Sequence, residues 1–283
     1  MVGDPDICFY GSTSDCAVVE KPSARVAERR ATTPAVQSTC VERPRRLSDA
    51  AVLTLDGYGT LVDRESGIIS ALMPWLNDVG VTAERGEILR AFAQAERANM
   101  IPGVSYRDVL IRVHDGLAEF FGVAPDQKAA EEFASSIGRW PLHPDAPAAL
   151  AYLKQHFQLV VLTNADHAAF DVTNEALGVE FDAVYTAEDA GAYKPSTAMF
   201  AFLLNKLDEA GIERRRVMHV AGSIQFDHVP AKRLAMNTCW IHRKDGQQRL
   251  AEAHKRGFDI RPDFRFRTLG GLADAHWAET CRN

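Results

Sequence analysis

A short apolar run that ends in an aspartate is the feature that most constrains the fold of this chain. Residues 51–55 are Ala-Val-Leu-Thr-Leu, and the turn Asp56-Gly57-Tyr58-Gly59-Thr60 follows them directly. An apolar run of this length is typical of a buried strand, and the two glycines mark a tight turn after it. The sequence therefore predicts a buried strand that carries Asp56 at its carboxyl end.

The patterns before and after residue 141 decide the fold class. Apolar residues recur at helical spacing through residues 66–140, without a strand signal. From Pro141 onward helices and strands alternate, with strands predicted at 157–162, 181–185, 217–221 and 238–241. Such alternation builds a parallel sheet with helices on both faces. We expect an α/β protein whose core, residues 49–65 and 141–283, is interrupted by a helical domain at 66–140.

Residues 1–48 differ from the rest of the chain. Between Gly11 and Arg46 there is no aromatic residue and no Leu, Ile or Met. Such a segment buries too little apolar surface to offset the entropy lost on ordering, so we expect a disordered extension.

Charge and cysteine content narrow the class of protein. The 283 residues carry 32 Lys and Arg against 38 Asp and Glu, a formal net charge of −6. This balance disfavours nucleic-acid binding, and no apolar stretch reaches the roughly 18 residues of a membrane span. The five cysteines are scattered without a C-x-x-C pair, which argues against a disulfide framework and a structural zinc site. We expect a cytoplasmic protein with no nucleic-acid or membrane partner.

Polar side chains follow several of the predicted strands. Asp56 ends the first, Thr163-Asn164 ends the second, and Gly222-Ser223 ends a later one with Asp227 close behind, while Lys194 lies in a loop before a helix. Ligands of open parallel sheets bind beyond the carboxyl ends of the strands, so we expect these residues to converge at one edge. Taken singly, each has an ordinary alternative: Asp56 in a turn, Lys194 in solvent, Asp227 as a helix cap.

These segments resemble the motifs of the haloacid dehalogenase (HAD) superfamily over about residues 50 to 270. Asp56-Gly57-Tyr58-Gly59-Thr60-Leu61 is similar to the first motif, Thr163-Asn164 to the second, Lys194-Pro195 to the third, and Ser223 with Asp227 to the fourth. The resemblance implies a Rossmann-like core with an α-helical cap inserted after the first motif. Dimerisation is an expectation from the resemblance only.

The resemblance also implies roles for individual residues. Asp56 would be the nucleophile, attacking to form a covalent ester that water hydrolyses. Lys194 would keep Asp56 charged and oriented, since a nearby cation lowers a carboxylate pKa. Thr60 would hydrogen-bond the nucleophile, and Asp227 would tune Lys194 or position water. The expected substrate-binding residues are Tyr58, Thr163, Asn164 and Ser223.

Tyr58 points to one branch of the superfamily. Phosphatases carry a second Asp at this position to protonate the leaving oxygen, and they have Gly-Asp where this chain has Ala221-Gly222. A leaving halide needs no proton, so the pattern resembles L-2-haloacid dehalogenases, which use no metal or other cofactor. The expected substrate is a short 2-halo carboxylic acid, or a small carboxylate with another activated α-leaving group. The alternatives are an Mg²⁺-dependent phosphatase acting on a small phosphomonoester and a non-catalytic scaffold.

The chain also departs from the dehalogenase pattern. The position of the cap arginine that helps to receive the halide falls nearest to Gln94, with Arg90 and Arg97 about one turn away on either side. Phe200 stands where a tyrosine is common, and Ile224 where an asparagine is common. His219, inside an apolar strand, is expected to be a core histidine.

Overall fold

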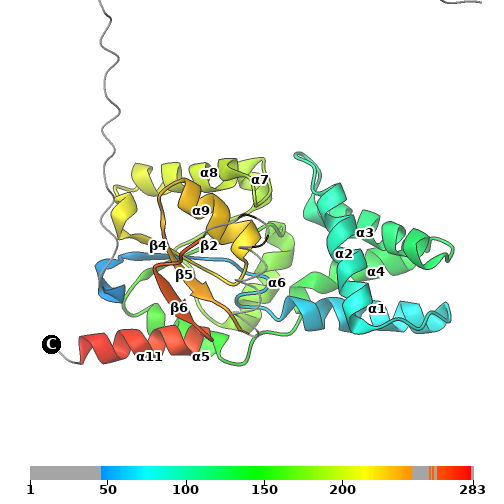
Figure 1. Cartoon of the computed structure of the whole chain (residues 1–283), viewed down its shortest axis with the longest axis horizontal. Coiled ribbons are helices and arrows are strands. Elements are labelled where there is room, and N and C mark those ends of the chain that lie inside the picture. Colours follow the sequence, from blue (N-terminus) through cyan, green and yellow to red (C-terminus); the bar gives the residue numbers. More distant parts are fainter. Residues whose placement is uncertain (1–45, 244–254, 256, 258–259, 282–283) are drawn as a thin grey trace, which may run out of the picture. The chain divides into compact units, whose positions relative to one another are not determined.

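The computed structural model describes residues 46–243, 255, 257 and 260–281 (Figure 1). Its centre is a parallel sheet of six strands in the order β3-β2-β1-β4-β5-β6. The order reverses between β1 and β4, which is where open α/β sheets bind ligands. The strands are β1 (Val52–Leu55), β2 (Gln158–Leu162), β3 (Ala183–Tyr185), β4 (Val217–Ala221), β5 (Asn237–Ile241) and β6 (Phe264–Phe266).

Helices cover both faces of the sheet because its central strands are apolar on both sides. Leu53 and Leu55 pack with α5 (Ala146–Leu153), α6 (His167–Leu177) and α11 (Leu269–Thr280). Val52 packs instead with α8 (Thr197–Glu209) and α9 (Val229–Arg233). Figure 1 shows α8 and α9 on one side of the sheet and α5 and α11 on the other. The expected layered α/β core is confirmed.

The segment between β1 and α5 is helical. It comprises α1 (Arg64–Asp78), α2 (Arg85–Asn99), α3 (Tyr106–Phe121), α4 (Gln127–Ser136) and the 3₁₀ turn η2 (Ile137–Arg139). We call these helices the cap. Where the chain leaves the core and returns to it, the Asp63 N–H donates to Pro141 O at 2.8 Å, so the two connections lie side by side.

A carboxylate from the core caps the first turn of α3. The backbone N–H groups of Tyr106 and Arg107 donate to Oδ1 and Oδ2 of Asp166, each at 2.7 Å. Two donors that a helix start otherwise leaves unpaired are thereby satisfied across the junction between cap and core.

The folded core begins earlier in the chain than the sequence predicted. The extension was expected to run to residue 48, but Leu47–Asp49 forms the 3₁₀ turn η1, and Leu47 is buried against the core. The N–H groups of Leu47 and Ser48 donate to the Glu279 carboxylate on α11 at 3.0 and 3.2 Å. With the Ser48 hydroxyl, which also donates to this carboxylate, three hydrogen bonds and a buried leucine attach these residues to the core. Residues 1–45 lie outside the described part of the chain.

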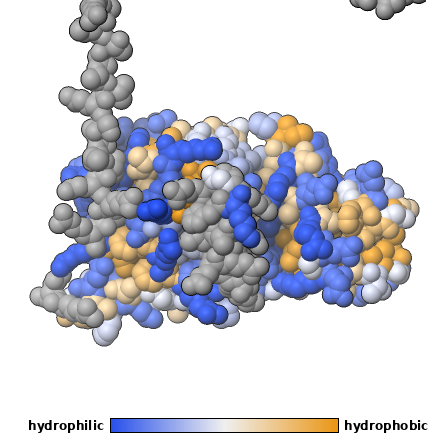
Figure 2. Space-filling model, in the orientation of Figure 1, coloured by the Kyte–Doolittle hydropathy of each residue, from blue (hydrophilic) through white to orange (hydrophobic). Residues whose placement is uncertain are grey.

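Figure 2 shows hydrophilic residues over much of the drawn face, with apolar areas over parts of the core and of the cap. Within the described residues, no helix combines the length and apolar character needed to cross a membrane.

Candidate active site

Asp56 lies at the carboxyl end of β1, next to β4. Its backbone N–H donates to Val220 O at 3.1 Å, so the pairing of the two strands continues to this residue. The chain then turns through Gly59, whose φ of +105° strongly favours glycine. The turn brings the Thr60 hydroxyl back to donate to Asp56 Oδ2 at 2.7 Å, and Thr60 Oγ1 in turn accepts from the Gly222 N–H at 2.8 Å. Thr60 thus ties the loop that follows Asp56 to the end of β4.

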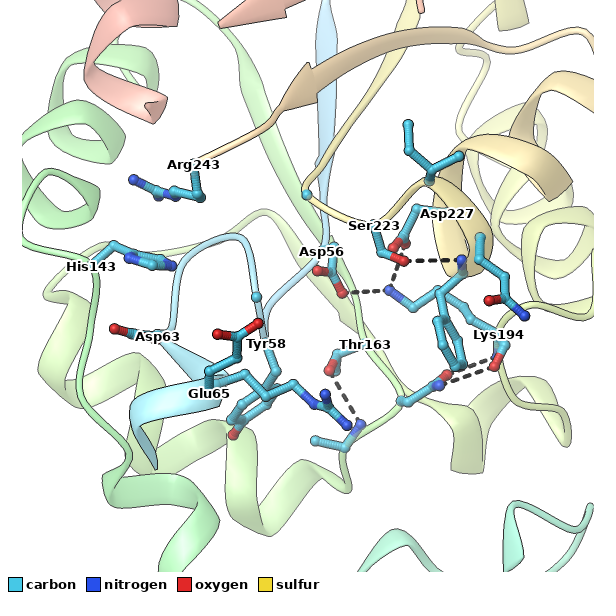
Figure 3. Close-up of a pocket in the computed structure, with 18 of the residues that line it drawn as sticks. Asp56, Tyr58, Asp63, Glu65, His143, Thr163, Lys194, Ser223, Asp227 and Arg243 are labelled. Atoms are coloured by element: carbon cyan, nitrogen blue, oxygen red, sulfur yellow. Dashed lines mark hydrogen bonds and ion pairs between the residues drawn. The ribbon is translucent and has the colours of Figure 1, made fainter. Parts of the chain in front are cut away.

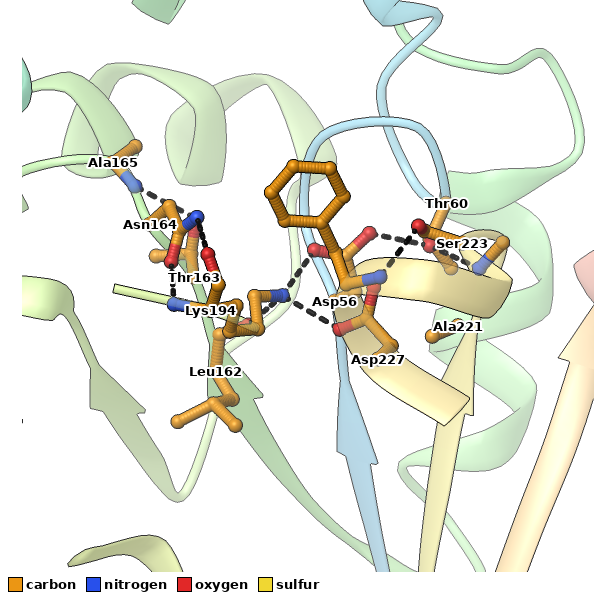
Figure 4. A network of polar contacts seen from close by, with 12 residues as sticks. Asp56, Thr60, Leu162, Thr163, Asn164, Ala165, Lys194, Ala221, Ser223 and Asp227 are labelled. Atoms are coloured by element: carbon orange, nitrogen blue, oxygen red, sulfur yellow. Dashed lines mark hydrogen bonds and ion pairs between the residues drawn. The ribbon is translucent and has the colours of Figure 1, made fainter. Parts of the chain in front are cut away.

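Lys194 is the centre of the polar network (Figure 4). Its Nζ donates to Asp56 Oδ1 at 2.6 Å, to Asp227 Oδ1 at 2.8 Å and to Leu162 O at 2.9 Å. An ammonium has three donors, and all three are used although the side chain is only 2% exposed. Lys194 is therefore no solvated loop residue.

Asn164 fixes the backbone of Lys194. Its Oδ1 accepts from the Lys194 N–H at 2.8 Å, while its Nδ2 donates to Lys194 O at 3.1 Å. Both ends of the amide are occupied, so Asn164 lines the cavity but acts first on the loop that carries the lysine.

Asp227 is buried in a single π-helical turn, η4 (Ile224–His228). The N-cap of that turn is Ser223, whose Oγ accepts from the Phe226 N–H at 3.1 Å. Asp227 does not cap a helix; its Oδ1 faces Lys194 and His219. The expected site residues from four separate elements are thus brought together at one sheet edge.

The two carboxylates share one cation but titrate differently. Burial and the charge of Asp227 raise the pKa of Asp56, and Lys194 and Thr60 only partly oppose them. Burial would also raise the pKa of Asp227, but the Lys194 charge and the hydrogen bonds from His219 and Lys194 outweigh it, lowering the pKa to about 2. For Lys194, burial is overcome by its two carboxylate partners, so its pKa lies above the usual value. Asp56 is therefore the first of the pair to accept a proton.

Tyr58 contributes its ring rather than its hydroxyl. The ring lines the cavity, but the hydroxyl is hydrogen-bonded to Thr173 Oγ1 at 2.8 Å and points away from Asp56 (Figure 3). Burial raises the pKa of Tyr58 to about 12. The position that carries an acid in phosphatases therefore presents no proton donor toward Asp56 here.

A cavity of about 740 Å³ opens above Asp56 (Figure 3). Of the expected residues, Asp56, Tyr58, Thr163, Asn164, Lys194, Ser223 and Asp227 line it, whereas Thr60 lies behind Asp56. Its volume falls within the roughly 300–1,000 Å³ usual for small-molecule sites.

The cap wall of this cavity differs from expectation. Gln94 is exposed and does not line it; the α2 residues that do are Ala93, Glu96 and Arg97. Each residue advances a helix by about 100°, so Gln94 is turned away from the face that Ala93 and Glu96 share. Of the three residues near the expected position of the cap arginine, Arg97 lines the cavity, whereas Gln94 and Arg90 do not.

Three residues of the cap wall were not identified as a group from sequence. Arg64, the first residue of α1, contacts Glu96 Oε2 at 2.6 Å through Nη2, and the Tyr106 hydroxyl donates to Glu96 Oε1. The sequence did contain an indication of this contact. Glu96 continues the buried stripe of Ile88 and Phe92 at intervals of four residues, and a carboxylate buried on an apolar stripe needs a polar or charged partner.

Arg243 closes the cavity on the core side. It is ion-paired with Asp145 through Nη1, and its Nη2 donates to Thr60 O. This arginine follows β5 and therefore sits at the same sheet edge as Asp56, but no motif marks it.

The residues present do not fit the magnesium ion of the phosphatase alternative. A Cβ at Gly222 would lie 2.7 Å from Gly59 O, so no carboxylate has room there, and position 58 holds a tyrosine. Asp56 and Asp227 both face the Lys194 ammonium. In the described part of the chain, no three or more His, Cys, Asp or Glu side chains are grouped to hold a metal.

Solved structures of several other proteins are similar to this one. Among solved structures, the L-2-haloacid dehalogenase PA0810 is similar with a TM-score of 0.67 at 22% identity, over 81% of this chain and 99% of that one. The L-2-haloacid dehalogenase from Xanthobacter autotrophicus gives 0.64 at 20% identity, over 80% and 97%. The putative HAD-hydrolase YfnB from Bacillus subtilis, bound to magnesium, gives 0.65 at 17% identity, over 80% and 98%.

At these identities the solved structures show a shared fold. No curated protein matches the chain in sequence at a significant level. A family model described as haloacid dehalogenase-like hydrolase matches residues 51–227, more than half of the chain and all four motif segments. The resemblance inferred from the motifs is thus confirmed, and this chain belongs to the haloacid dehalogenase-like hydrolase family.

Proposed function

We propose that the protein hydrolyses the carbon–halogen bond of a short 2-haloalkanoic acid through a covalent ester on Asp56, without a metal ion. A small carboxylate with another activated α-leaving group belongs to the same class. The observation that carries the proposal is the Lys194 ammonium between Asp56 and Asp227, at 2.6 and 2.8 Å. The positive charge between the two carboxylates is thus supplied by a side chain of the protein.

In the first step an Asp56 carboxylate oxygen attacks the α-carbon. A carbon–oxygen bond forms, the carbon–halogen bond breaks, and the halide leaves with the bonding pair. Lys194 and Thr60 each hold one oxygen of Asp56, which orients the carboxylate before it reacts. The halide needs no proton, which agrees with the Tyr58 hydroxyl being turned to Thr173.

In the second step water attacks the carboxyl carbon of the Asp56 ester. The oxygen of Asp56 that did not attack becomes an oxyanion, and the donor that already holds it, the Lys194 ammonium at Oδ1 or the Thr60 hydroxyl at Oδ2, is suited to stabilise it. The bond between the carboxyl carbon and the ester oxygen then breaks. The 2-hydroxy acid leaves with one oxygen from Asp56, water replaces that oxygen, and one proton is released overall.

We assign the substrate carboxylate to the wall formed by Thr163 and Ser223, which line the cavity beside Asp56. Asn164 serves this wall indirectly, by fixing the Lys194 backbone. A solved relative at 20% identity, the Xanthobacter autotrophicus L-2-haloacid dehalogenase, carries covalently bound chloropropionic acid and supports the proposed chemistry. The magnesium-bound Bacillus subtilis relative supports the phosphatase alternative, against which the crowding at Gly222 counts.

The test compares halide release from chloroacetate and from each enantiomer of 2-chloropropionate with phosphate release from an aryl phosphate, with Mg²⁺ and with chelator. We expect halide release that chelator leaves unchanged and that Asp56→Asn abolishes. Asp171→Asn, an exposed carboxylate on α6, is the matched control and keeps activity.

A single turnover in heavy-oxygen water examines the ester directly. The oxygen of the first product comes from Asp56 and is unlabelled if the proposal is right. Direct entry of solvent label contradicts the ester. Chelator-sensitive phosphate release supports the phosphatase, and no turnover of any substrate supports a non-catalytic scaffold.

A further inference from the structure

A buried pair of polar side chains lies behind the proposed catalytic network. Thr54 of β1 and His219 of β4 are register partners in adjacent parallel strands, and neither is accessible to solvent. The Thr54 hydroxyl and His219 Nδ1 are 2.9 Å apart, and His219 Nε2 is 3.1 Å from Asp227 Oδ1. Polar groups this deep in an apolar sheet are costly unless each is hydrogen-bonded, and here each is.

The partners of His219 determine where its proton lies. Asp227, with its low pKa, is ionised at neutral pH and can only accept hydrogen bonds, so Nε2 must carry a hydrogen. In the neutral imidazole, Nδ1 then accepts from the Thr54 hydroxyl. The ring cannot easily swing away, because the Phe200 ring packs edge-on against it with centroids 5.2 Å apart.

We propose that His219, held by Thr54, is a positioning residue for the nucleophile. Asp227 Oδ1 receives the His219 Nε2–H and the Lys194 Nζ–H together, and Lys194 in turn donates to Asp56. Removing the histidine leaves Asp227 free to rotate about its side-chain bonds, and Lys194 free to follow it away from Asp56. The core histidine expected from sequence thus acts on the site through two intermediate side chains.

The expected effect on activity rests on the proposed function. Each disruptive variant is matched with a conservative one. His219→Leu removes the donor, whereas His219→Gln offers an amide N–H to Asp227. Thr54→Val removes the hydroxyl, whereas Thr54→Ser keeps it. We expect His219→Leu to lower kcat for halide release by up to about 100-fold with little change in KM, because a misplacement of about 1 Å at the reacting groups can have an effect of this size. His219→Gln and Thr54→Ser restore most of the loss.

A neighbouring histidine controls for simple destabilisation. His228 is equally buried, but its Nε2 contacts Ala221 O rather than a site carboxylate. His228→Leu is expected to lower the melting temperature while leaving kcat within about threefold of wild type, a change of less than 1 kcal/mol. If His219→Leu and His228→Leu reduce kcat equally, or if His219→Gln rescues nothing, the positioning role is wrong.

A readout that needs no substrate separates this inference from the proposed function. The nitrogen resonance of the Lys194 ammonium, observed by NMR in ¹⁵N-lysine protein, reports on its surroundings. We expect it to shift in His219→Leu and to return toward its wild-type position in His219→Gln. If the wild type releases no halide, the proposed function falls, and this resonance still decides the inference. An unchanged resonance in His219→Leu overturns it whatever the protein catalyses.

Discussion

Gly222 lies so close to Gly59 that a Cβ atom at position 222 would be 2.7 Å from the Gly59 carbonyl oxygen. The contact joins the end of β4 to the loop that carries Asp56 and Thr60. Any side chain at 222 must therefore push the loop of Asp56 and Thr60 away.

The first prediction follows from this contact. Gly222→Ala should destabilise the protein by about 1–3 kcal/mol, the usual effect of overpacking, and should lower halide release. Gly270→Ala is the control, because Gly270 lies in helix α11 and a Cβ there makes only ordinary contacts with Asp145 and Thr268, at 3.6 Å or more. Urea unfolding and initial rates measure both effects. Wild-type stability and rate in Gly222→Ala would contradict the structure.

The same contact predicts that the phosphatase pattern cannot be restored by two changes. Tyr58→Asp with Gly222→Asp supplies the missing carboxylates, but the second clashes with the backbone at Gly59. We expect the double variant to lose halide release and to gain no Mg²⁺-dependent phosphate release.

The second prediction concerns Lys194, which is the buried partner of both Asp56 and Asp227. Lys194→Met leaves two buried carboxylates without a cation and should cost about 3–5 kcal/mol of stability. Activity should fall by about 1,000-fold or more, the scale for losing a central catalytic group.

The pH dependence makes the Lys194 prediction specific. Burial and the Asp227 charge already raise the pKa of Asp56 in the wild type, and Lys194 opposes them. Without the ammonium the pKa of Asp56 rises further above its unfolded value, so the folded variant binds more protons than the unfolded chain. Its stability should therefore rise as pH falls from 7 toward 5. Urea unfolding at several pH values checks the sign. If the stability of Lys194→Met instead falls between pH 7 and pH 5, in parallel with the wild type, Asp56 and Asp227 are not left as buried carboxylates without a cation.

The convergence of the motif residues at one sheet edge could be predicted from the sequence, for a physical reason. Asp56, Asn164 and Asp227 each follow a strand of a parallel sheet, and the ends of β1, β2 and β4 are adjacent, so their convergence follows from topology. Arg64 and Glu96 were missed as a pair because their contact depends on how α1 and α2 pack, which the helical periodicity of each does not specify. Which of Arg90, Gln94 and Arg97 lines the cavity depends on the rotation of α2 about its axis, which spacing along the chain does not specify.

His219 illustrates the same limit. An apolar strand indicates a buried residue, and the histidine is buried. Its partners depend on the register of β1 against β4, which places it opposite Thr54, and on the π-helical turn that carries Asp227. Neither feature has a recognisable signature in the sequence.

The third prediction uses the pKa of Asp56. Because burial and the Asp227 charge raise it above 3.8, the acid limb of kcat/KM should lie above pH 3.8. Thr60→Val removes the hydroxyl that stabilises the carboxylate and should move the limb upward by about 1 pH unit, since a hydrogen bond to a charged group is worth about 1.5 kcal/mol. Thr60→Ser should keep the wild-type limb. A limb that Thr60→Val leaves in place, or moves downward, is inconsistent with the hydrogen bond.

The alkaline limb tests Lys194 in the same profiles. The two carboxylates hold its pKa above 10.5, so its loss of charge should not reduce kcat/KM below about pH 10. A fall centred between pH 8 and 9 would mean that another group, or a differently placed lysine, controls the reaction.

The fourth prediction concerns His114 on α3, in the core of the cap. The side chain is inaccessible to solvent, and both ring nitrogens lack a hydrogen-bond partner among the described residues. The Trp75 ring packs against the imidazole at a tilt of 51°, with 4.1 Å between centroids. Burial lowers its pKa below 6.5, against the weaker opposing effect of Asp115 and Asp126. As pH falls below 6.5 the unfolded chain takes up a proton that the folded protein does not, so stability is lost until the folded pKa is reached.

The size of this effect is bounded. One proton changes the free energy of unfolding by at most about 1.4 kcal/mol per pH unit. Burial also lowers the pKa of His228, to about 4, and it contributes in the same direction, so the measurement is a difference between wild type and His114→Leu. Urea unfolding at pH 7.5, 6.5 and 5.5 should give a shallower loss of stability in the variant, whatever its stability at pH 7.5. Equal slopes would place the titrating histidines elsewhere and leave His114 protonated or solvated in the folded protein.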